Sequence, residues 1–395
     1  MADTYDAIVI GGGVVGASTA YYLKKLGCPR VLLVERDDIC SGGTAKSCAI
    51  IRTHYTIPSN SLLAAKSLEI FQNFAEVLGD PEATCGFVNS GYIILAADDG
   101  IAHHLRESVT TQSNAGVETF EISPKEARAL HPRLNVEDAK VLAFEPNSGY
   151  ADPYLTTSGF ISAGRKLGLD VRANCPVTGL LTEGDRVVGI DTPDGPVHAD
   201  TVISAVGPWT GQIAAWANIS VPLEISRHIV LTFRDSDPYE ATLPIVKDMT
   251  TANKMYFRPS SGGVALVGTG DHGDPVVDAD GLDETVNDDF VLLQGKQMAH
   301  RMPSFEMAEL AATWTGPYDI TPDWNPVLGR TPSVDGLVLA YGFSGHGFKL
   351  APMVGKILAQ TTLDQPCDVD LHPYRLGRFE DGQLLTGSYG VGSIS

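Results

Sequence analysis

The N-terminal stretch DAIVIGGGVVGASTAYYLKKLG, residues 6–27, constrains the fold more than any other part of the chain. A short β-branched run comes before the glycines, and an apolar stripe at helical spacing follows them and ends at Gly27. A second apolar run, VLLV, leads directly to Glu35. This order predicts a buried strand, a glycine-rich turn, a helix and a second parallel strand.

The spaced glycines of this unit each have a mechanical role toward a dinucleotide. Gly11 allows the tight turn, Gly13 lets a pyrophosphate approach the backbone, and Gly16 lets the helix pack closely on the strand. The helix N-terminus offers N–H groups to the phosphates, and Glu35 stands where an acid accepts hydrogen bonds from ribose hydroxyls. A glycine turn that binds nothing is the alternative, which the surrounding strand, helix and acid disfavour. The expected dinucleotide contacts here are Gly11, Gly13, Val14, Val15, Gly16, Glu35 and Arg36.

The motif by itself does not distinguish NAD from FAD. An NAD enzyme would usually continue with regularly alternating strands and helices, whereas here the pattern breaks at RDDICSGGTAKSCAIIRTHY, residues 36–55. The polar loop at residues 41–44 could wrap a second, extended part of a cofactor. Both cofactors therefore stay open at this point.

Composition argues against several classes of function. The chain has 395 residues and a formal net charge of −20, from 28 basic and 48 acidic residues, which disfavours nucleic acid and anionic membranes as partners. Its six cysteines form no CxxC pair and no zinc-type spacing, so we expect no metal site and mostly reduced, buried thiols. The chain has no signal-peptide pattern and no apolar run near the roughly 20 residues of a membrane span. The protein is therefore expected to be cytoplasmic.

Later segments return to the cofactor pattern. An apolar strand ends in GPW at residues 207–209, a second close approach of backbone to a cofactor. Near the C-terminus GLVLAYGFSGHGFK, residues 336–349, runs from a strand into a glycine turn, and a helix is expected at 353–361. Strand patterns fill the stretch 220–315. The cofactor domain therefore comes in three pieces, with a strand-rich domain inserted between them.

With these motifs the chain resembles the FAD-dependent amine oxidoreductases of the D-amino-acid oxidase superfamily. Within that superfamily it is most similar to sarcosine oxidases, both the monomeric kind and the β subunits of the heterotetrameric kind. The resemblance covers nearly the whole chain. Its specific markers are GGGVVG with Glu35, AIIRTHY at 49–55, the VTGL and ISAVGPW stretches, YDITPDWNPVLG at 318–329 and GFSGHGFK at 342–349.

The resemblance implies an α/β fold, in which a Rossmann-like FAD-binding domain in discontinuous segments carries an inserted α+β substrate domain rich in antiparallel sheet. FAD is then the cofactor. The expected FAD-binding domain comprises residues 1–80, 146–218 and 325–380, the substrate domain residues 81–145 and 219–324, and the C-terminal tail residues 381–395.

In the family the C-terminal glycine turn passes beside the isoalloxazine ring. Its backbone N–H groups, here those of residues 345–348, bond the ring edge where negative charge develops on reduction. The resemblance also assigns the substrate carboxylate to Lys349 and Arg52. A point charge and a planar fork together fix the rotation of a carboxylate and so present the substrate C–H bond to flavin N5. The alternative is that both residues are solvated surface charges.

The remaining expected site residues also follow from the resemblance. Tyr256 and Tyr318 match tyrosines that line the pocket near the flavin, although a buried tyrosine that merely satisfies a carbonyl is the alternative. His54 and His272 lie near active-site stretches but fit structural roles better. The expected catalytic residues are Arg52, Tyr256, Tyr318, His346 and Lys349. The further expected cofactor contacts are Gly43, Thr44, Ser47, Val177, Gly207, Trp209, Gly345, His346, Gly347, Phe348 and Lys349.

Three positions depart from the family pattern. Gly316 stands where the monomeric oxidases attach FAD through a cysteine, so we expect FAD to be held without a covalent bond. Val267 stands at or next to the place of a lysine that helps those oxidases reduce oxygen, so a dehydrogenase with another electron acceptor becomes credible. Ala49 replaces an arginine, which is expected to enlarge the pocket or change the surroundings of the flavin.

The resemblance implies oxidation of a small secondary or N-methylated amino acid, such as sarcosine, dimethylglycine or a proline-like compound, to an imine that hydrolyses. One alternative is a glycine or D-amino-acid oxidase or dehydrogenase. Another is a flavin-binding β subunit that is active only in a hetero-oligomer, with the tail 381–395 as a docking segment. The expected partners are an amino-acid substrate and oxygen or another acceptor. The substrate, the acceptor, the oligomeric state and the role of the tail stay open.

Overall fold

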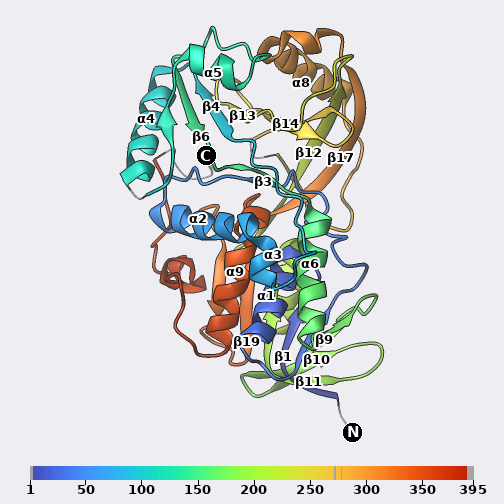
Figure 1. The fold of residues 1–395 in the computed structure, drawn as a ribbon. Coiled ribbons are helices and arrows are strands. Elements are labelled where there is room, and N and C mark those ends of the chain that lie inside the picture. The colour runs from blue at the N-terminus through green and yellow to red at the C-terminus, as the bar shows by residue number, and fades with distance from the viewer. Residues whose placement is uncertain (1–2, 115, 271–272, 277, 389–395) are drawn as a thin grey trace.

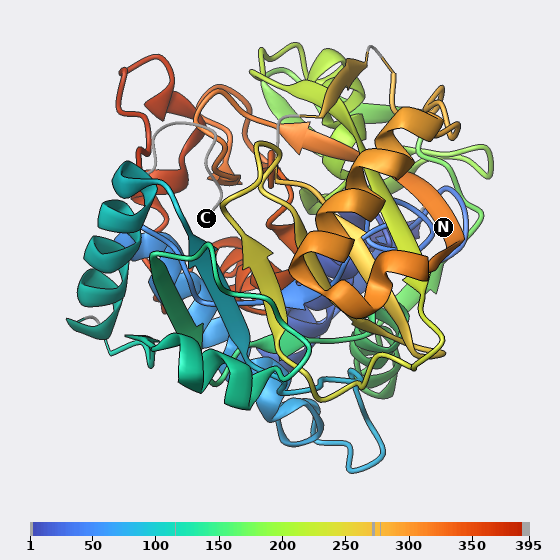
Figure 2. The same ribbon diagram turned by 90° about the horizontal axis from the view of Figure 1, so that it is seen from above.

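The computed structural model describes residues 3–114, 116–270, 273–276 and 278–388, which form two parts stacked one above the other (Figure 1). The lower part holds the N-terminus, and the helix α2 (Pro58–Gln72) lies where the two parts meet. Seen from above, the strands and helices of the upper part spread over the lower one (Figure 2). No helix of the described residues is long and apolar enough to cross a membrane.

The lower sheet has a parallel centre. Its strand order is β18-β19-β11-β1-β2-β8, with β10 and β9 added beyond β11. β1 pairs in parallel with both β11 and β2, and β11 pairs in parallel with β19. The strands are β1 (Asp3–Ile10), β2 (Val31–Val34), β8 (Asp170–Arg172), β9 (Gly179–Glu183), β10 (Arg186–Asp191), β11 (Val197–Ser204), β18 (Val327–Arg330) and β19 (Leu337–Tyr341). β2 and β19 are buried along their whole length, as expected when helices and other layers cover both faces of a sheet.

Helices pack closely against this sheet. The central helix α1 (Val14–Lys25) lies between α9 (Gly347–Thr362) and α6 (Pro153–Lys166). A side chain at Gly355 of α9 would collide with Ser18, whose hydroxyl donates to the carbonyl of Pro352. The shorter helices of this part are α3 (Phe74–Leu78) and α7 (Thr210–Trp216), with a 3-10 turn at Gly207–Trp209.

The upper sheet is mostly antiparallel. Its order is β16-β12-β15-β14-β13-β4-β6-β5, with β17 paired to β12, and β13 and β4 run parallel. The strands are β4 (Tyr92–Ala96), β5 (Phe120–Glu121), β6 (Val141–Glu145), β12 (Glu224–Arg234), β13 (Ile245–Asp248), β14 (Tyr256–Ser260), β15 (Val264–Gly268), β16 (Asp274–Val276) and β17 (Glu309–Ile320). Its helices are α4 (Asp99–Asn114), α5 (Pro124–Leu130) and α8 (Asp288–Arg301), and a small ladder of β3 (Ile50–Ile51) with β7 (Gly149–Tyr150) lies near the junction.

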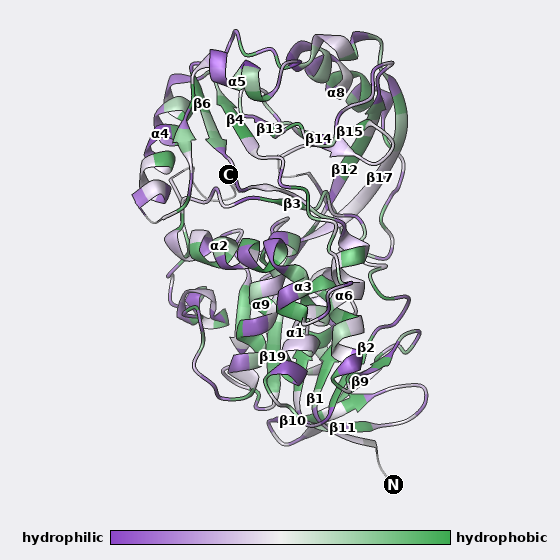
Figure 3. Ribbon diagram, viewed as in Figure 1, coloured by the Kyte–Doolittle hydropathy of each residue, from purple (hydrophilic) through white to green (hydrophobic). Residues whose placement is uncertain are grey.

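Hydrophobic residues concentrate in the strands and on the inward helix faces, whereas the outer faces of α4 and α8 carry many polar residues (Figure 3). The α/β fold predicted from the sequence, with a parallel dinucleotide-type sheet and an inserted, mostly antiparallel sheet, is confirmed. The limits given above for the two domains stay a proposal.

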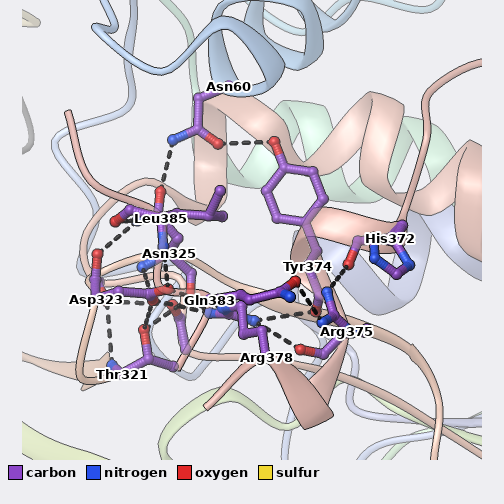
Figure 4. A network of polar contacts seen from close by, with 12 residues as sticks. Asn60, Thr321, Asp323, Asn325, His372, Tyr374, Arg375, Arg378, Gln383 and Leu385 are labelled. Atoms are coloured by element: carbon purple, nitrogen blue, oxygen red, sulfur yellow. Dashed lines mark hydrogen bonds and ion pairs between the residues drawn. The ribbon is translucent and has the colours of Figure 1, made fainter. Parts of the chain in front are cut away.

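The end of the described chain packs onto the lower part. Arg378 is fully buried and donates to both carboxylate oxygens of Asp323, at 2.8 and 2.9 Å (Figure 4). The hydroxyl of Tyr374 donates to Asn60, and the amide of Leu385 donates to Asp323 at 3.0 Å. Residues 381–388 of the predicted tail therefore lie against their own chain, while residues 389–395 are outside the described residues.

One expectation needs correction in detail, and the expectation of mostly buried thiols is confirmed. The C-terminal helix was expected at 353–361, but α9 begins at Gly347, inside the glycine turn. The cysteines of the described chain are free thiols and four are buried, whereas Cys48 is half-buried and Cys367 is exposed. The early start of α9 matters for function because it places Lys349 in the first turn of a helix.

Candidate active site

The dinucleotide motif forms a tight cradle at the end of β1. Gly11 has φ +108°, and a Cβ there would lie 2.5 Å from the carbonyl oxygen of Ala205. A Cβ on Gly13 would lie 2.9 Å from the Thr44 hydroxyl, and one on Gly16 would collide with the Gly11 carbonyl. Only glycine therefore leaves this surface open to a bound group.

A cavity of about 470 Å³ extends from this cradle through the lower part. Its volume is within the usual range for a small-molecule or cofactor site. Fifteen of the residues that the sequence predicted as cofactor contacts line it: Gly11, Gly13, Val14, Val15, Glu35, Arg36, Gly43, Thr44, Ser47, Val177, Gly207, Trp209, Gly345, Gly347 and Phe348. Gly16, His346 and Lys349 do not line this cavity.

Two helix N-termini open onto the cavity. The first turn of α1 contains no acidic residue, and no side chain caps it from Gly13. The first turn of α9 also lacks an acid, and the side chain of its N-cap residue His346 makes no capping bond. Such N-termini favour negative charge through N–H groups without a partner inside the helix, although in α1 the Val14 amide already donates to the Thr44 hydroxyl at 3.1 Å. The cavity therefore fits a long group that is anionic in its middle and accepts hydrogen bonds at its far end.

Glu35 closes one end of the cradle. Its carboxylate accepts from the Gly12 amide at 2.7 Å and from the Asp37 amide at 3.0 Å. These contacts hold the acid beside the glycine turn, where its remaining acceptor capacity can serve ribose hydroxyls.

The glycine turn at residues 342–348 forms the other end. Gly345 has φ +84°, and a Cβ there would lie 2.5 Å from the Tyr318 ring. Asp319 ties the turn to β17, because its side chain accepts from the Gly342 amide at 2.7 Å and its carbonyl accepts from the Ser344 amide at 2.9 Å. Asp319 also lines the cavity, and burial raises the pKa of its carboxyl group to about 6.

Lys349 and Arg52 are both buried, with 7% of each residue exposed, so the alternative of solvated surface charges is wrong. The Lys349 ammonium donates to the Gly345 carbonyl at 3.4 Å. Burial and then the nearby Arg52 charge hold the pKa of Lys349 well below its ordinary value. The Arg52 guanidinium donates to the His54 carbonyl and lies 4.7 Å from the centre of the Tyr55 ring. Two cations from segments far apart in sequence thus meet beside the glycine turn.

His346 is the N-cap residue of α9 and is near both of these charges. It is 2% exposed and stacks on Tyr55 with 5.3 Å between ring centres. Within the described part of the chain, both ring nitrogens of His346 lack a hydrogen-bond partner, and so does the Tyr55 hydroxyl. Burial, then the charges of Lys349 and Arg52, hold the pKa of His346 well below its ordinary value. The imidazole is therefore neutral at pH 7, with one donor and one acceptor available to a ligand.

The two predicted tyrosines are both close to this end. Tyr318 lines the cavity, and His228 stacks on it with 3.6 Å between ring centres. The Tyr256 hydroxyl lies 3.2 Å from the Cys48 sulfur, and burial raises the pKa values of both groups. Cys48 is also tied down through its carbonyl, which accepts from Arg258 at 2.7 Å.

Sequence reasoning missed three of these residues. Cys48 directly precedes the AIIRTHY marker, Tyr55 is its last residue, and Asp319 is the second residue of YDITPDWNPVLG. Each of the three lies in or beside one of the sequence motifs, but the local sequence does not indicate which residue each one contacts.

The positions that depart from the expected pattern are also located. Gly316 lines the cavity, and the buried side chain of Val267 belongs to an apolar cluster that contains Leu231 and Phe257. The strand β15 thus turns Val267 away from Tyr256, and it is Gly268 that faces the Tyr256 ring. The place of the family's lysine, at Val267 or next to it, stays a prediction.

Of the two histidines expected to have structural roles, His54 and His272, only His54 lies among the described residues. His54 is 1% exposed and lies 3.4 Å from the carboxylate of Glu145, which also accepts from the Ser148 hydroxyl at 2.7 Å. This buried pair supports the loop that carries Arg52, as a structural role requires. His272 lies outside the described residues.

Comparison with known proteins gives a match over most of the chain. A family model described as FAD dependent oxidoreductase matches residues 6–361. The bovine FAD-dependent oxidoreductase domain-containing protein 1 is 29% identical over 96% of this chain and 85% of its own length. The sarcosine oxidase subunit beta of Rhodobacter capsulatus is 28% identical over 97% of this chain and 92% of its own length. Human mitochondrial sarcosine dehydrogenase is 28% identical over 95% of this chain, which spans 41% of that longer protein.

Two solved structures also match this chain over most of its length. An L-proline dehydrogenase from P. horikoshii superposes with a TM-score of 0.89 at 28% identity, over 97% of this chain and 100% of that one. A glycine oxidase from Geobacillus kaustophilus superposes with a TM-score of 0.83 at 25% identity, over 95% of this chain and 99% of that one.

Proposed function

Because the chain belongs to the family of FAD-dependent oxidoreductases and uses FAD, we propose that it oxidises the C–N bond of a small secondary or N-methylated amino acid. The product is an imine, which water hydrolyses. The observation that carries the proposal is the pair of buried cations, Lys349 and Arg52, beside the glycine turn at the end of the cofactor cavity. FAD bound in that cavity supplies the acceptor for a hydride equivalent.

The two cations bind and orient the substrate carboxylate. A buried lysine whose pKa is lowered by burial and by a neighbouring arginine is stabilised as an ammonium when a carboxylate arrives. The arginine side chain offers a planar fork to the same carboxylate. Together they fix both the position and the rotation of the substrate, which is the main contribution that positioning makes to catalysis.

His346 faces the substrate amine in this proposal. Its neutral imidazole has a nitrogen lone pair without a hydrogen-bond partner in the described residues, and this lone pair accepts the substrate N–H. The same positive charges that bind the carboxylate disfavour an ammonium group nearby, so the amine loses its proton on binding. A neutral amine is the form that can release a hydride equivalent from its carbon.

The aromatic residues exclude water from this end. Tyr55 is buried against Arg52, and the half-buried rings of Tyr318 and Tyr256 lie against His228 and Cys48. A dry site strengthens each charge interaction with the substrate. The polar groups that remain without partners, the His346 ring and the Tyr55 hydroxyl, then favour a ligand with hydrogen-bonding atoms.

The relatives support this class of substrate. Their names refer to sarcosine in the Rhodobacter capsulatus subunit and the human enzyme, and to L-proline in the P. horikoshii dehydrogenase. These substrates share a carboxylate and a secondary amine on a small carbon skeleton. We propose sarcosine, proline and pipecolate as the first compounds to test, and dimethylglycine after them, because its neutral tertiary amine has no N–H to donate to His346.

An anaerobic substrate screen tests the proposal. The FAD-loaded protein is mixed with each compound without oxygen, and loss of the yellow flavin absorbance is followed in a stopped-flow instrument. We expect bleaching with at least one secondary amino acid and none with the matching amine that lacks the carboxylate. Equal bleaching by the amine alone would contradict the role of the two cations.

Glycine or a D-amino acid is a second candidate substrate class, because the Geobacillus kaustophilus structure is named a glycine oxidase. The same screen separates the two classes. If glycine bleaches the flavin and its N-methyl derivative does not, the primary amine is the substrate and the first proposal is wrong.

A third candidate is a subunit that acts only within an assembly, since the chain aligns with 92% of a protein named sarcosine oxidase subunit beta. The purified chain alone decides this under anaerobic conditions. Flavin bleaching without any partner supports an enzyme that works by itself, whereas bleaching that needs a cell extract supports the subunit.

A further inference from the structure

A short segment of the upper part lies across the cofactor cavity of the lower part. This segment, residues 279–284 and called here the cover segment, follows β16 and precedes α8. Four of its residues line the same cavity as the glycine cradle: Ala279, Asp280, Leu282 and Glu284. The wall of the cavity is thus completed by a segment from outside the dinucleotide-type sheet.

The first attachment of the cover segment is made by Asp280. Its carboxylate accepts from both terminal nitrogens of Arg36, at 3.1 and 2.5 Å, and from the Trp209 indole at 2.8 Å. The Arg36 guanidinium also lies over the Trp209 ring, 4.4 Å from its centre. One acidic side chain therefore joins two cavity residues that the sequence had predicted as cofactor contacts.

The second attachment joins Glu284 to Lys46, at 3.5 Å. Both attachments are accessible to solvent, because the side chains of Arg36, Asp280 and Glu284 are 41, 52 and 76% exposed. Exposed ion pairs are weak individually and are screened by salt. The ion pairs that hold the cover segment on the cofactor side are therefore weak enough to break and re-form.

The other side of the segment is fastened differently. The Asp283 carbonyl accepts from Arg227 at 2.6 Å and from the Thr315 hydroxyl at 3.2 Å. Arg227 and Thr315 lie in β12 and β17, which pair along their length. The cover segment is thus anchored to a sheet on one side and clipped by side-chain charges on the other.

The walls formed by the strand ends and the glycine turn are not of this kind, whereas the loop at residues 41–47 is a second irregular wall. Gly11, Val34 and Ala205 belong to or directly follow the ends of β1, β2 and β11, whose ladders would have to break to let a large group pass. The glycine turn at the far end is fixed by Asp319 and by the start of α9. Release of the cover segment needs only a few exposed contacts to break.

We propose that the cover segment is a removable wall through which FAD enters and leaves, and that Asp280 and Glu284 set the rate of FAD exchange. Arg36 and Trp209 act in part through Asp280, by holding this wall, rather than only by touching the dinucleotide. The proposal rests on FAD binding and not on the substrate class, so it stands or falls independently of the reaction proposed above.

The rate of FAD release tests the proposal on the intact, FAD-loaded protein. The protein is diluted, free FAD is separated by filtration at intervals, and its fluorescence is measured. We expect Asp280→Asn to release FAD about tenfold faster and the Asp280→Asn/Glu284→Gln double variant faster still, because charge-assisted hydrogen bonds are lost. High salt should speed release from the wild type and have little effect on the double variant.

The matched control is Asp289→Asn, which removes the same charge from the exposed first turn of α8, outside the cover segment. It should leave the release rate within twofold of the wild type. An equal acceleration in this control would mean a general charge effect and overturn the proposal, as would an unchanged rate in both cover variants with unchanged FAD content.

A double-mutant cycle separates the two roles of Arg36. Arg36→Gln is made alone and together with Asp280→Asn. If Arg36 acts through Asp280, adding Asp280→Asn to Arg36→Gln changes little. The FAD release rates of Arg36→Gln and of the double variant then agree within twofold. If the effects of the two substitutions on the FAD release rate simply multiply, Arg36 retains FAD by direct contact and not through its ion pair with Asp280.

Discussion

The two ends of the cofactor cavity are built by different means. The cradle end consists of backbone: glycines at the close of β1, the first turn of α1 and one acid at the end of β2, all within the first 35 residues. The end proposed to bind the substrate, called here the substrate end, consists of buried charges and rings, and Arg52 and Lys349 come from opposite ends of the chain. The cradle end is formed by residues close together in sequence, in a pattern suited to phosphate and ribose groups. The other end is formed by residues that meet only when the whole chain has folded.

The difference has an energetic consequence. At the cradle end the binding groups are N–H dipoles that cost little to leave solvated. At the substrate end, Lys349 and His346 are held in apolar surroundings that push both pKa values well below the ordinary ones. The substrate end is therefore the strained end, and substitutions there should change ligand binding more than substitutions at the exposed wall of the cradle.

The largest expected effect concerns how FAD is held. Gly316 offers no thiol, and the cavity that it lines is shaped by backbone. We therefore expect acid denaturation followed by centrifugation to leave all the yellow colour in the supernatant. Colour that stays with the pellet would show a covalent link and would remove the contrast drawn here, since the cradle end would then also hold its ligand by a bond.

The next largest effect is expected from the two buried cations. Arg52→Ala or Lys349→Met should weaken substrate binding by between about thirtyfold and several thousandfold, because losing one partner of a buried charge contact costs roughly 2–5 kcal/mol. FAD content should stay unchanged. The measurement is the substrate dissociation constant from anaerobic flavin titration.

A matched control for the lysine lies on the same helix. Lys356→Met removes an equal charge from α9, but Lys356 is paired with Asp368 near the surface. We expect normal substrate binding in this variant. If Lys349→Met behaves like Lys356→Met, the carboxylate binds elsewhere and the proposed substrate end is wrong.

A smaller effect is expected in the reaction with oxygen. The strand β15 turns Val267 into the apolar core, so it presents no cation toward Tyr256. Because Val267 supplies no cation to stabilise developing superoxide, reoxidation by oxygen should be slower than in a good oxidase, by on the order of a hundredfold. Stopped-flow mixing of the reduced protein with oxygen measures it, and an artificial acceptor should react faster.

One cation that the sequence did not single out bears on this prediction. The Lys247 ammonium lies 5.3 Å from the centre of the Tyr256 ring and is buried. If reoxidation proves fast, Lys247→Met should slow it while leaving substrate reduction intact. Fast reoxidation in both proteins would show that neither β15 nor Lys247 controls the oxygen reaction.

These two ends also show what a sequence can reveal. The cradle could be predicted because its spacing is local: strand, glycines, helix and Glu35 follow one another within one supersecondary unit. The sequence motifs supplied Lys349 as well, but not its setting in the first turn of α9, since helix starts within glycine turns carry little periodic signal.

The missed residues have a common physical reason. Tyr55 matters because it stacks on His346, and Asp319 matters because it accepts from Gly342. Both contacts join segments far apart in the chain, and no spacing rule brings such segments together. The burial of Lys349 and Arg52 could not be predicted for a similar reason, because a charge flanked by apolar residues can be either solvated or enclosed.

The smallest expected effect concerns Asp319, which belongs to both ends because it lines the cavity and fixes the glycine turn. Burial raises the pKa of this carboxyl group from 3.8 to about 6, against the opposing effect of the Phe343 and Gly342 amides. The buried hydroxyl of Tyr341, on the adjacent β19, is near enough for the two groups to affect each other electrostatically. A raised carboxyl pKa means that the folded protein binds this proton more tightly than the unfolded chain.

The sign of the pH dependence follows from that difference. The stabilisation from Asp319 is fully present below about pH 4 and is lost as the pH rises through about 6, so between pH 5 and pH 7 it should fall by about 1 kcal/mol. Asp319→Asn keeps an oxygen for the Gly342 amide but has no proton to lose, so its free energy of unfolding should lack this component. Denaturant unfolding of both FAD-loaded proteins at pH 5 and pH 7 measures it. We expect the stability of the variant relative to the wild type to increase from pH 5 to pH 7, whereas a decrease would mean that the ionised carboxylate stabilises the turn.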